Sequence, residues 1–379
     1  MRSFVFNKAI VDHLDPFPDA DYSKPIGYET VRYPLSGLVG PADKAATEAH
    51  NAKFADYSLN VKLLNLNIVS WLTTGITVQG TFHPYNVGRE YRNCLDAPNY
   101  TVFSNTTSAT EWNDHTDTPA VPLESPHNHI HLAVGGYEVP GQGDFSPIDG
   151  ANGDMGENDT AGLDPIFFFH HCHVDRMFWL WQKRHGCTGS LEIMEGYPGT
   201  NSVDSQGPTP GVAPNSWLNV DSPLAPFRHP DGRPVVSRDL VDIEQQLGYT
   251  YGPGSLDDLA APALAAEAPQ PPAGVISIRG VNRAAIRGSF LLSAFGTVDG
   301  TRQHLGTEAI LSRWHVEGCM NCQTHLEARG HIRLHDEVAA ALDPDSVEVE
   351  VRTRGREHPG ASVAGGPGVP AARFTVRLR

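Results

Sequence analysis

The sequence predicts a mainly α, loop-rich domain followed by an all-β sandwich. Two short histidine-rich runs each carry a helix-start signal, and a stretch rich in alanine and proline separates them from short, alternating apolar segments. We expect the helical domain to span residues 1–250, a linker to span 251–273 and the sandwich to span 274–379.

Composition and charge argue against several classes of protein. The 379 residues are 40% hydrophobic and 19% charged, and the formal net charge of −16 argues against binding to nucleic acid or to an anionic membrane surface. No apolar run approaches the roughly 20 residues that a membrane span needs. The N-terminus lacks a signal-peptide pattern and the five cysteines are too few for a disulfide scaffold, so we expect a cytoplasmic protein.

The N-terminal third predicts few regular elements. Prolines interrupt residues 1–60, although helices are predicted at about 42–51 and 58–73, where leucines recur near helical spacing in the second. Residues 81–123 are expected to be rich in loops, with an aromatic turn at 100–105.

A first histidine helix is predicted at about 124–134. A proline suits its first turn, and a glycine pair marks its end. His127 and His131 are four residues apart, so their imidazoles lie on one face of the helix. His129 is turned by about 200° from that face, because each helical residue adds about 100°. We therefore expect a site that uses the first two histidines and leaves out the third.

A second histidine helix is predicted from Pro165 to His185, with Asp164 as its N-cap. It is apolar on nearly every side, so we expect it to be the most buried element. His170 and His171 are about 100° apart, so at most one of them completes a site with the first pair. Three imidazoles suit copper, zinc or iron.

The stretch between these helices, 136–163, carries seven glycines and several acids, so we expect a flexible, solvated loop. Its acids fit solvation better than metal binding, although their place before the second helix would let them border a substrate entrance. These acids are Asp144, Asp149, Asp154, Glu157 and Asp159.

The C-terminal half predicts one short helix, after which the spacing of the apolar residues changes to that of β-strands. The helix is expected at 237–247, before the linker. Alternating apolar segments after the linker predict the strands of the sandwich. The predicted strands lie at Val275–Ile278, Ser289–Phe295, His331–Leu334, Val347–Val351 and Phe374–Leu378.

The two histidine runs resemble a known motif. They read His127-Asn128-xx-His131, and then Asp164-Pro165-x-Phe167-xx-His170-His171-xxx-Asp175-Arg176. This pattern closely resembles the second copper-binding motif of tyrosinases, a family of type-3 copper proteins that also includes catechol oxidases and molluscan haemocyanins. The likeness extends to Gly135-Gly136 after the first helix and to Phe178–Gln182 after the motif.

The resemblance implies a ligand set for one copper. His127, His131 and His171 would bind the copper that the family calls CuB, and His170 would be a neighbour. Asp175, one turn after the third ligand, would support the helix and its imidazoles.

The resemblance also implies a role for Glu124 and Asn128. In tyrosinases a glutamate and an asparagine near this place hold a water that helps to deprotonate the phenol. The chemistry fits, because a phenol has a pKa of about 10 and loses its proton before it binds copper.

The chain also departs from the family pattern. Type-3 chemistry uses two coppers with three histidines each, and the first motif precedes the second. Upstream of residue 124 the histidines are His13, His50, His83 and His115, and no two of them have helical spacing. We therefore expect a chain truncated at its N-terminus, or from a shortened gene, that carries one half of a dicopper site.

Three further features lie outside the motif. Cys172 is expected to be a packed thiol. Trp314 is either an aromatic plug over the copper, as in C-terminal domains of the family, or a core residue of the sandwich. Cys319-x-x-Cys322 is a disulfide, a zinc half-site, a redox pair, or a copper-loading pair such as some fungal relatives carry, since thiolates suit Cu(I).

The expected function is oxidation of monophenols and o-diphenols to o-quinones by dioxygen. The expected partners are a small phenol and dioxygen, with two coppers expected for the family and one site visible here; a homo-oligomer is left open. Three alternatives remain: an oxidase for o-diphenols or o-aminophenols alone, an inactive fragment that binds a single copper, and a haemocyanin-like oxygen carrier.

Overall fold

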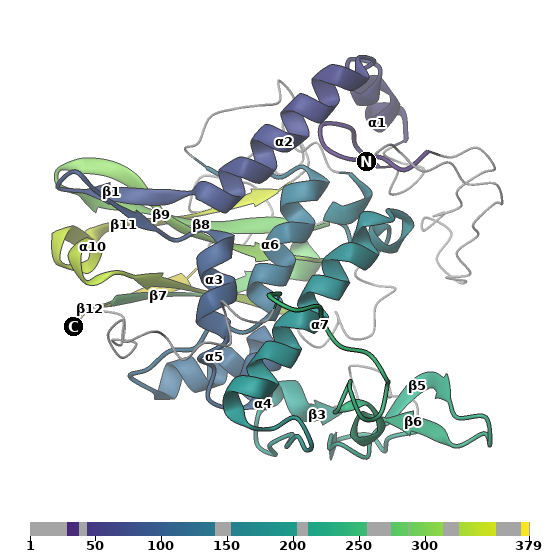
Figure 1. Ribbon diagram of the computed structural model, residues 1–379. Coiled ribbons are helices and arrows are strands. Elements are labelled where there is room, and N and C mark those ends of the chain that lie inside the picture. Colours follow the sequence, from purple (N-terminus) through teal and green to yellow (C-terminus); the bar gives the residue numbers. More distant parts are fainter. Residues whose placement is uncertain are drawn as a thin grey trace. The chain divides into compact units, whose positions relative to one another are not determined.

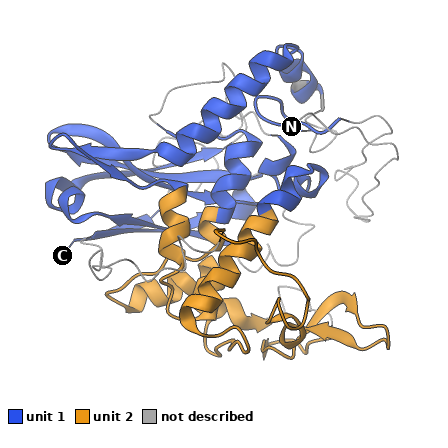
Figure 2. Cartoon of the chain, viewed as in Figure 1, with its two compact units in different colours: residues 1–87, 127–170, 273–379 blue, residues 88–126, 171–272 orange. Residues whose placement is uncertain are grey.

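The computed structural model describes residues 29–37, 44–140, 153–202, 211–255, 274–286, 288–313, 326–353 and 373–378. The chain divides into two compact units, coloured in Figure 2. Unit 1 combines residues 1–87, 127–170 and 273–379, and unit 2 combines residues 88–126 and 171–272. The boundary at 170/171 falls within one continuous helix. The domain limits at 250 and 274 stay a prediction.

Unit 1 contains the predicted sandwich. Two three-stranded antiparallel sheets, ordered β10-β7-β12 and β11-β8-β9, share one apolar core (Figure 1). Ile276, Phe290 and Leu292 are fully buried in that core, where the two inner faces meet. The strands are β7 (Gly274–Asn282), β8 (Phe290–Val298), β9 (Thr301–Ile310), β10 (Glu327–Leu334), β11 (Leu342–Thr353) and β12 (Arg373–Leu378), and the short helix α10 (Asp336–Ala341) precedes β11.

One strand of this sandwich, β9, was not among the predicted segments. It follows β8 through a tight turn in which Asp299 and Gly300 both have positive φ, the conformation of two-residue hairpin loops. Its first half reads Thr-Arg-Gln-His, a polar run that hides the alternation. The segment forms a strand because it pairs with β8. Its backbone amides and carbonyls then bond to β8 instead of to water.

The helical part of unit 1 holds the first predicted helices. Asp56 caps α2 by accepting hydrogen bonds from the amides of Ser58 and Leu59. Asn67 donates to the carbonyl oxygens of Ala133 and Tyr137, which ties α2 to the end of the first histidine helix. The elements are α1 (Lys44–Asn51), α2 (Tyr57–Thr73), β1 (Gly75–Val78), β2 (Thr81–Pro84), α6 (Glu124–Gly135), η2 (Asp154–Gly156), η3 (Ala161–Leu163) and the start of α7 (Ile166–His185).

The β1-β2 hairpin packs on the sandwich. Ile76 and Val78 belong to the same buried cluster as the strands, and Gln303 donates to the carbonyl oxygen of Thr77 at 3.0 Å. The hairpin therefore shares the core of the sandwich, whereas Val134, Met155 and Ala161 form a separate apolar cluster beside the two histidine helices.

Unit 2 is more regular than the loop-rich reading of 81–123 predicted, so that prediction is wrong. Asn99 and Asn105 cap two successive short helices with their side-chain oxygens, and this capping replaces the expected loop. Phe103 stacks on Trp181 with ring centroids 4.8 Å apart. The elements are α3 (Val87–Cys94), α4 (Tyr100–Ser104), α5 (Thr106–His115), the rest of α7, η4 (Pro198–Thr200), β3 (Asn201–Ser202), β4 (Ser216–Trp217), β5 (Pro223–Arg228), β6 (Pro234–Val236) and η6 (Ser237–Leu240).

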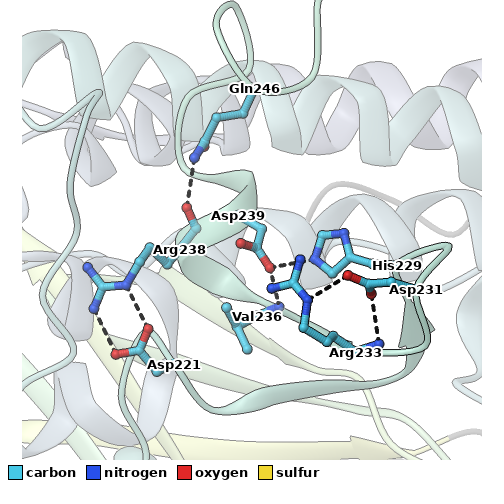
Figure 3. Close-up of polar contacts among 8 residues, drawn as sticks. All are labelled: Asp221, His229, Asp231, Arg233, Val236, Arg238, Asp239 and Gln246. Carbon is cyan, nitrogen blue, oxygen red and sulfur yellow. Dashed lines mark hydrogen bonds and ion pairs between the residues drawn. The ribbon is translucent and has the colours of Figure 1, made fainter.

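The predicted helix at 237–247 is also wrong, because only the single turn η6 forms. Asp242 accepts hydrogen bonds from the amides of Glu244 and Gln245, a local turn that competes with helix continuation. Arg238 forms a bidentate ion pair with the Asp221 carboxylate, which accepts from both Nε and Nη2. Figure 3 shows this network, whose members are Asp221, His229, Asp231, Arg233, Val236, Arg238, Asp239 and Gln246.

Among the described residues, no helix combines the length and the apolarity that crossing a membrane requires.

Candidate metal centre

The first histidine helix forms where the sequence predicts it. It runs from Glu124 to Gly135 and ends at Gly136, whose φ of 119° only glycine adopts readily. The amides of Gly136 and Tyr137 both bond to the carbonyl oxygen of Leu132, which closes the last turn. The helix therefore stops one turn after His131.

The second histidine helix begins at its predicted cap. Asp164 Oδ1 accepts a hydrogen bond from the amide of Ile166 at 2.9 Å, and the carbonyl oxygen of Asp164 accepts from Phe167. The Asp164 side chain is fully buried, so this cap is rigidly placed at the start of the helix that carries His170 and His171.

The structure brings the predicted histidines together. One ligand nitrogen from each of His127, His131, His170 and His171 lies within 4.8 Å of the others. The rings of His127 and His131 have centroids 4.6 Å apart, and the His170 ring lies 5.0 and 4.9 Å from them. This is the spacing of imidazoles that can converge on one metal ion.

Two of these imidazoles have a hydrogen-bonding partner that sets which nitrogen faces the metal. His131 Nδ1 donates to the carbonyl oxygen of Met155 at 2.9 Å, and His127 Nδ1 donates to Asn128 Oδ1 at 2.9 Å. Both acceptors are oxygens without a proton, so each Nδ1 carries the hydrogen and each Nε2 keeps a lone pair for a metal.

His170 has a different arrangement from the predicted ligands. Its Nε2 donates to the carbonyl oxygen of His127 at 3.1 Å, so only its Nδ1 could bind a metal while that bond persists. This bond ties α7 to α6 at the level of the cluster. The choice of His171 rather than His170 as third ligand stays a prediction.

Glu124 and Asp175 lie in hydrogen bonds that stabilise local structure. Glu124 Oε2 accepts from the amide of Thr106 at 2.7 Å, at the start of α5. Asp175 Oδ2 accepts from the hydroxyls of Tyr249 and Tyr251, the first at 2.9 Å, and with burial this raises the pKa of Tyr249 to about 12. Their predicted roles, in holding a water and in supporting the imidazoles, stay predictions.

The remaining histidines of the two runs face elsewhere. His129 Nε2 bonds to the carbonyl oxygen of Thr307 at 2.8 Å and its ring contacts Trp71, away from the cluster as its helical position predicts. His173 packs edge-on against Tyr91, and burial lowers its pKa. Both therefore serve packing rather than metal binding.

Two expectations about α7 are wrong. Cys172 is exposed rather than packed. Apart from His170, its buried residues lie between Met177 and Gln182, where Leu180 is fully covered, whereas Phe168 and Phe169 are each 63% exposed. An apolar side chain becomes buried only where another element covers its face, and none of the described elements covers those two rings.

The acids before α7 are not solvated as predicted. Asp154 and Glu157 are buried, because backbone amides from distant segments donate to them: Val31 to Asp154 at 3.1 Å, and Ser289 to Glu157 at 3.1 Å. These two carboxylates hold the described part of the loop, 153–163, against Val31 and Ser289, and the Met155 carbonyl between them contacts His131. Asp144 and Asp149 lie outside the described residues.

The three upstream histidines that the structure describes do not join the cluster. His50 bonds to the carbonyl oxygen of Pro34, His83 lies beside His335 and the carboxylate of Glu337, and His115 contacts Glu111. Among the described residues, the four-histidine group is the one cluster that could hold a metal. His13, Trp314, Cys319 and Cys322 lie outside the described residues.

Sequence reasoning missed two groups from other segments, one bonded to His131 and one bonded to Asp164 at the start of α7. The Met155 carbonyl that orients His131 is a backbone oxygen, so no residue type announces it. Arg32 bonds to Asp164 across 132 residues of sequence, and only its charge could have suggested a buried partner.

Comparison with known proteins identifies the class of this metal centre. Residues 3–184 match the family model of the common central domain of tyrosinase. The chain is 50% identical over 374 residues to tyrosinase HcTyr2 of Hahella sp. (strain CCB-MM4), covering 94% of this chain and 66% of that protein. It is 45% identical over 388 residues to a tyrosinase of Aspergillus oryzae, covering 94% of this chain and 70% of that protein.

Solved structures agree with the sequence matches. The tyrosinase of Burkholderia thailandensis superimposes with a TM-score of 0.79 at 45% identity, over 99% of this chain and 73% of that one. A recombinant mushroom tyrosinase shares the fold alone, with a TM-score of 0.56 at 20% identity. The histidine cluster and the fold are those of a copper oxidoreductase, and the chain belongs to the tyrosinase family. It spans about two thirds of the length of the first of these relatives.

Proposed function

We propose that the chain oxidises monophenols and o-diphenols to o-quinones with dioxygen. One observation carries the proposal: His127 and His131 each donate from Nδ1, so the Nε2 of each carries the lone pair that can bind copper, in a cluster with His170 and His171. The relatives that match nearly the whole chain bear the name tyrosinase, which supports the same substrate class.

Copper fits this donor set, because neutral imidazole is a preferred copper ligand. We assign Nε2 of His127, Nε2 of His131 and a nitrogen of His171 as the atoms that would hold it. Copper bound there would supply the binding of dioxygen, the transfer of one oxygen atom to a monophenol and the removal of two electrons from an o-diphenol.

The protein's own contribution is orientation and proton transfer. Asn128 keeps His127 in one tautomer, and the Met155 carbonyl does the same for His131. Glu124 lies one helical turn before Asn128 on the same face of α6. One oxygen of Glu124 holds the Thr106 amide, and we assign the other to a water that takes the phenolic proton, since that proton has a pKa of about 10 and does not leave unaided.

The proposal is tested by loading the purified chain with copper and supplying tyrosine or L-DOPA in the presence of dioxygen. We expect consumption of dioxygen and formation of o-quinone, measured by trapping with a nucleophile. The double variant H127A/H131A is the control and should form no quinone. A copper-loaded, folded chain that consumes no dioxygen with either substrate would contradict the proposal.

The same assay separates the narrower oxidases. Oxidation of L-DOPA without oxidation of tyrosine indicates an o-diphenol oxidase. Oxidation of an o-aminophenol alone indicates an o-aminophenol oxidase. Reversible binding of dioxygen without turnover indicates a carrier of the haemocyanin kind.

A second candidate is a chain that binds a single copper and does not turn over. The observation that favours it is that, among the described residues, His50, His83 and His115 belong to no group that could hold a metal and bond to other partners. Copper stoichiometry distinguishes the two candidates: two coppers per chain support the oxidase, and one copper per chain without turnover supports the second candidate.

A further inference from the structure

A short segment at residues 31–33 contacts each element that carries a predicted ligand. It belongs to unit 1, as do α6 from His127 onward and the start of α7. Its three residues make three separate sets of contacts, and each partner lies more than a hundred positions away in the sequence. Contacts at such separation are formed only by the folded chain, so they report how the two helices are held together.

Two of these sets of contacts involve backbone amides of the segment, those of Tyr33 and Val31. The Tyr33 amide donates to the carbonyl oxygen of Val134, in the last turn of α6, and the Tyr33 hydroxyl donates to Glu138 at 2.7 Å. Val31 pairs with Asp154 in both directions: the Val31 amide donates to Asp154 Oδ2, and the Asp154 amide donates to the carbonyl oxygen of Val31. Asp154 directly precedes Met155, whose carbonyl orients His131.

The third contact uses a side chain. Arg32 Nε and Nη2 each donate to one oxygen of Asp164, both at 2.6 Å, in the parallel geometry that arginine makes with carboxylates. The Asp164 side chain is fully buried and that of Arg32 is 11% exposed. Since Asp164 also caps α7, its position sets where the helix begins and therefore where His170 and His171 lie.

Close packing fixes the segment against the turn at residue 153. A Cβ atom placed on Gly153 would lie 2.7 Å from the Cα of Arg32 and 2.8 Å from the carbonyl oxygen of Val31. No side chain fits in that space, so the two backbones touch only because residue 153 is glycine. The 31–33 segment thus cannot shift without moving the Asp154–Met155 turn.

We propose that Arg32 is a positioning residue for the copper centre and that the 31–33 segment sets the separation between the two histidine helices. Arg32 acts through Asp164 on α7, while Val31 and Tyr33 hold the Met155 turn and the end of α6. This role concerns how the metal is held, and it applies whichever phenol is oxidised and whether or not the chain turns over.

The alternative is that Arg32 only stabilises the fold. A buried arginine–carboxylate pair costs several kcal/mol when one partner is removed, wherever it lies. A purely stabilising pair would lower the melting temperature of the variant but leave the coordination of bound copper unchanged. A positioning pair changes the coordination itself, so the spectrum of the bound metal separates the two readings.

The experiment uses the full chain with sub-stoichiometric Cu(II) and with Cu(I). R32M removes the ion pair, R32K keeps the charge but not the paired geometry, and D164N keeps an acceptor oxygen for the cap. We expect R32M to weaken copper binding by about 10- to 100-fold in competition with a chromogenic chelator, as loss of a residue behind a ligand does elsewhere. We also expect its Cu(II) hyperfine splitting by electron paramagnetic resonance to change, with R32K and D164N intermediate.

The matched control is R184M. Arg184 forms an ion pair with Asp96 at the other end of the same helix, about 30 Å of helix away from Asp164. R184M should lower the melting temperature without changing copper affinity or the spectrum. If R32M does not fold, R32K and D164N carry the test. Unchanged affinity and splitting in folded R32K and D164N overturn the proposal, and so does a change in R184M as large as that in the Arg32 variants.

Discussion

His131 donates its Nδ1 hydrogen to the backbone carbonyl oxygen of Met155 at 2.9 Å. That bond places the hydrogen on Nδ1 and so leaves Nε2 of His131 with a lone pair that can bind a metal. The carbonyl belongs to a backbone turn that is stabilised by side-chain hydrogen bonds of Asp154, Glu157 and Thr160. A ligand that sequence alone identifies is therefore oriented by a backbone atom that sequence alone does not.

The third ligand can be assigned by replacing His170 and His171 with alanine one at a time. Because His170 Nε2 is bonded to the His127 carbonyl, we expect H171A to weaken copper binding more than the roughly 10- to 100-fold that loss of an outer partner causes. H170A should weaken it less, and H173A should have no effect. The measurement is copper affinity by chelator competition. Loss of binding in H170A with retention in H171A would assign His170 instead.

Asn128 offers a test of the orienting partner of His127. N128L removes the oxygen that holds Nδ1, so His127 can rotate or change tautomer, and copper affinity should fall by about 10- to 100-fold. N128D keeps an acceptor and should stay within a few-fold of the parent chain. Equal affinities in N128L and in the parent chain would show that His127 needs no such partner.

Glu124 has both a structural and a proposed catalytic role, and the two can be separated. E124A removes the acceptor of the Thr106 amide at the start of α5 and should lower the free energy of unfolding by about 1 kcal/mol. If Glu124 also holds the proton-accepting water, tyrosine oxidation should fall much more than L-DOPA oxidation. E111A, at an acid in the exposed last turns of α5, is the control. Equal loss on both substrates argues for the structural role alone.

The buried histidine of β9 predicts acid sensitivity. Burial lowers the pKa of His304 to about 3 from its ordinary 6.5. Between those values the unfolded chain binds a proton that the folded chain does not, so the free energy of unfolding falls as the pH is lowered from about 6.5 towards 3. The slope from this one group is at most about 1.4 kcal/mol per pH unit.

The check is urea unfolding at several pH values between neutrality and pH 4. H304Q loses contacts with Tyr85 and Thr307 and is less stable throughout, but its pH slope should be smaller than that of the parent chain. H115Q, at a histidine on the surface of α5, should leave the slope unchanged. A slope in H304Q as steep as in the parent chain would show that His304 is not the group that titrates.

The parts of the fold that were predictable have strong local signals. Both histidine helices begin and end where caps and glycines predict, and their ligand faces follow from the spacing of His127 and His131 alone. Five strands of the sandwich carry apolar alternation that is visible in sequence. These signals are local, since a cap or a period of two needs only neighbouring residues.

The missed parts depend on contacts that the local pattern of residues does not show. The first half of β9 is a polar run that becomes a strand because it pairs with β8. Asp154 and Glu157 looked like solvated acids because their amide donors are more than a hundred residues away. The exposure of Phe168 depends on which elements cover it, and hydrophobicity by itself cannot report that.

The sequence by itself determined the identities of the histidines, the helices that carry them and the family to which the chain belongs. Only the tertiary structure decided which imidazole nitrogen faces the metal and what holds α6 and α7 at their spacing. The physical reason is that a ligand's residue type and helical position are local properties. Its tautomer and its separation from the other ligands are set by hydrogen bonds that exist only in the folded chain, one accepted by the Met155 carbonyl and others donated by Arg32 to Asp164.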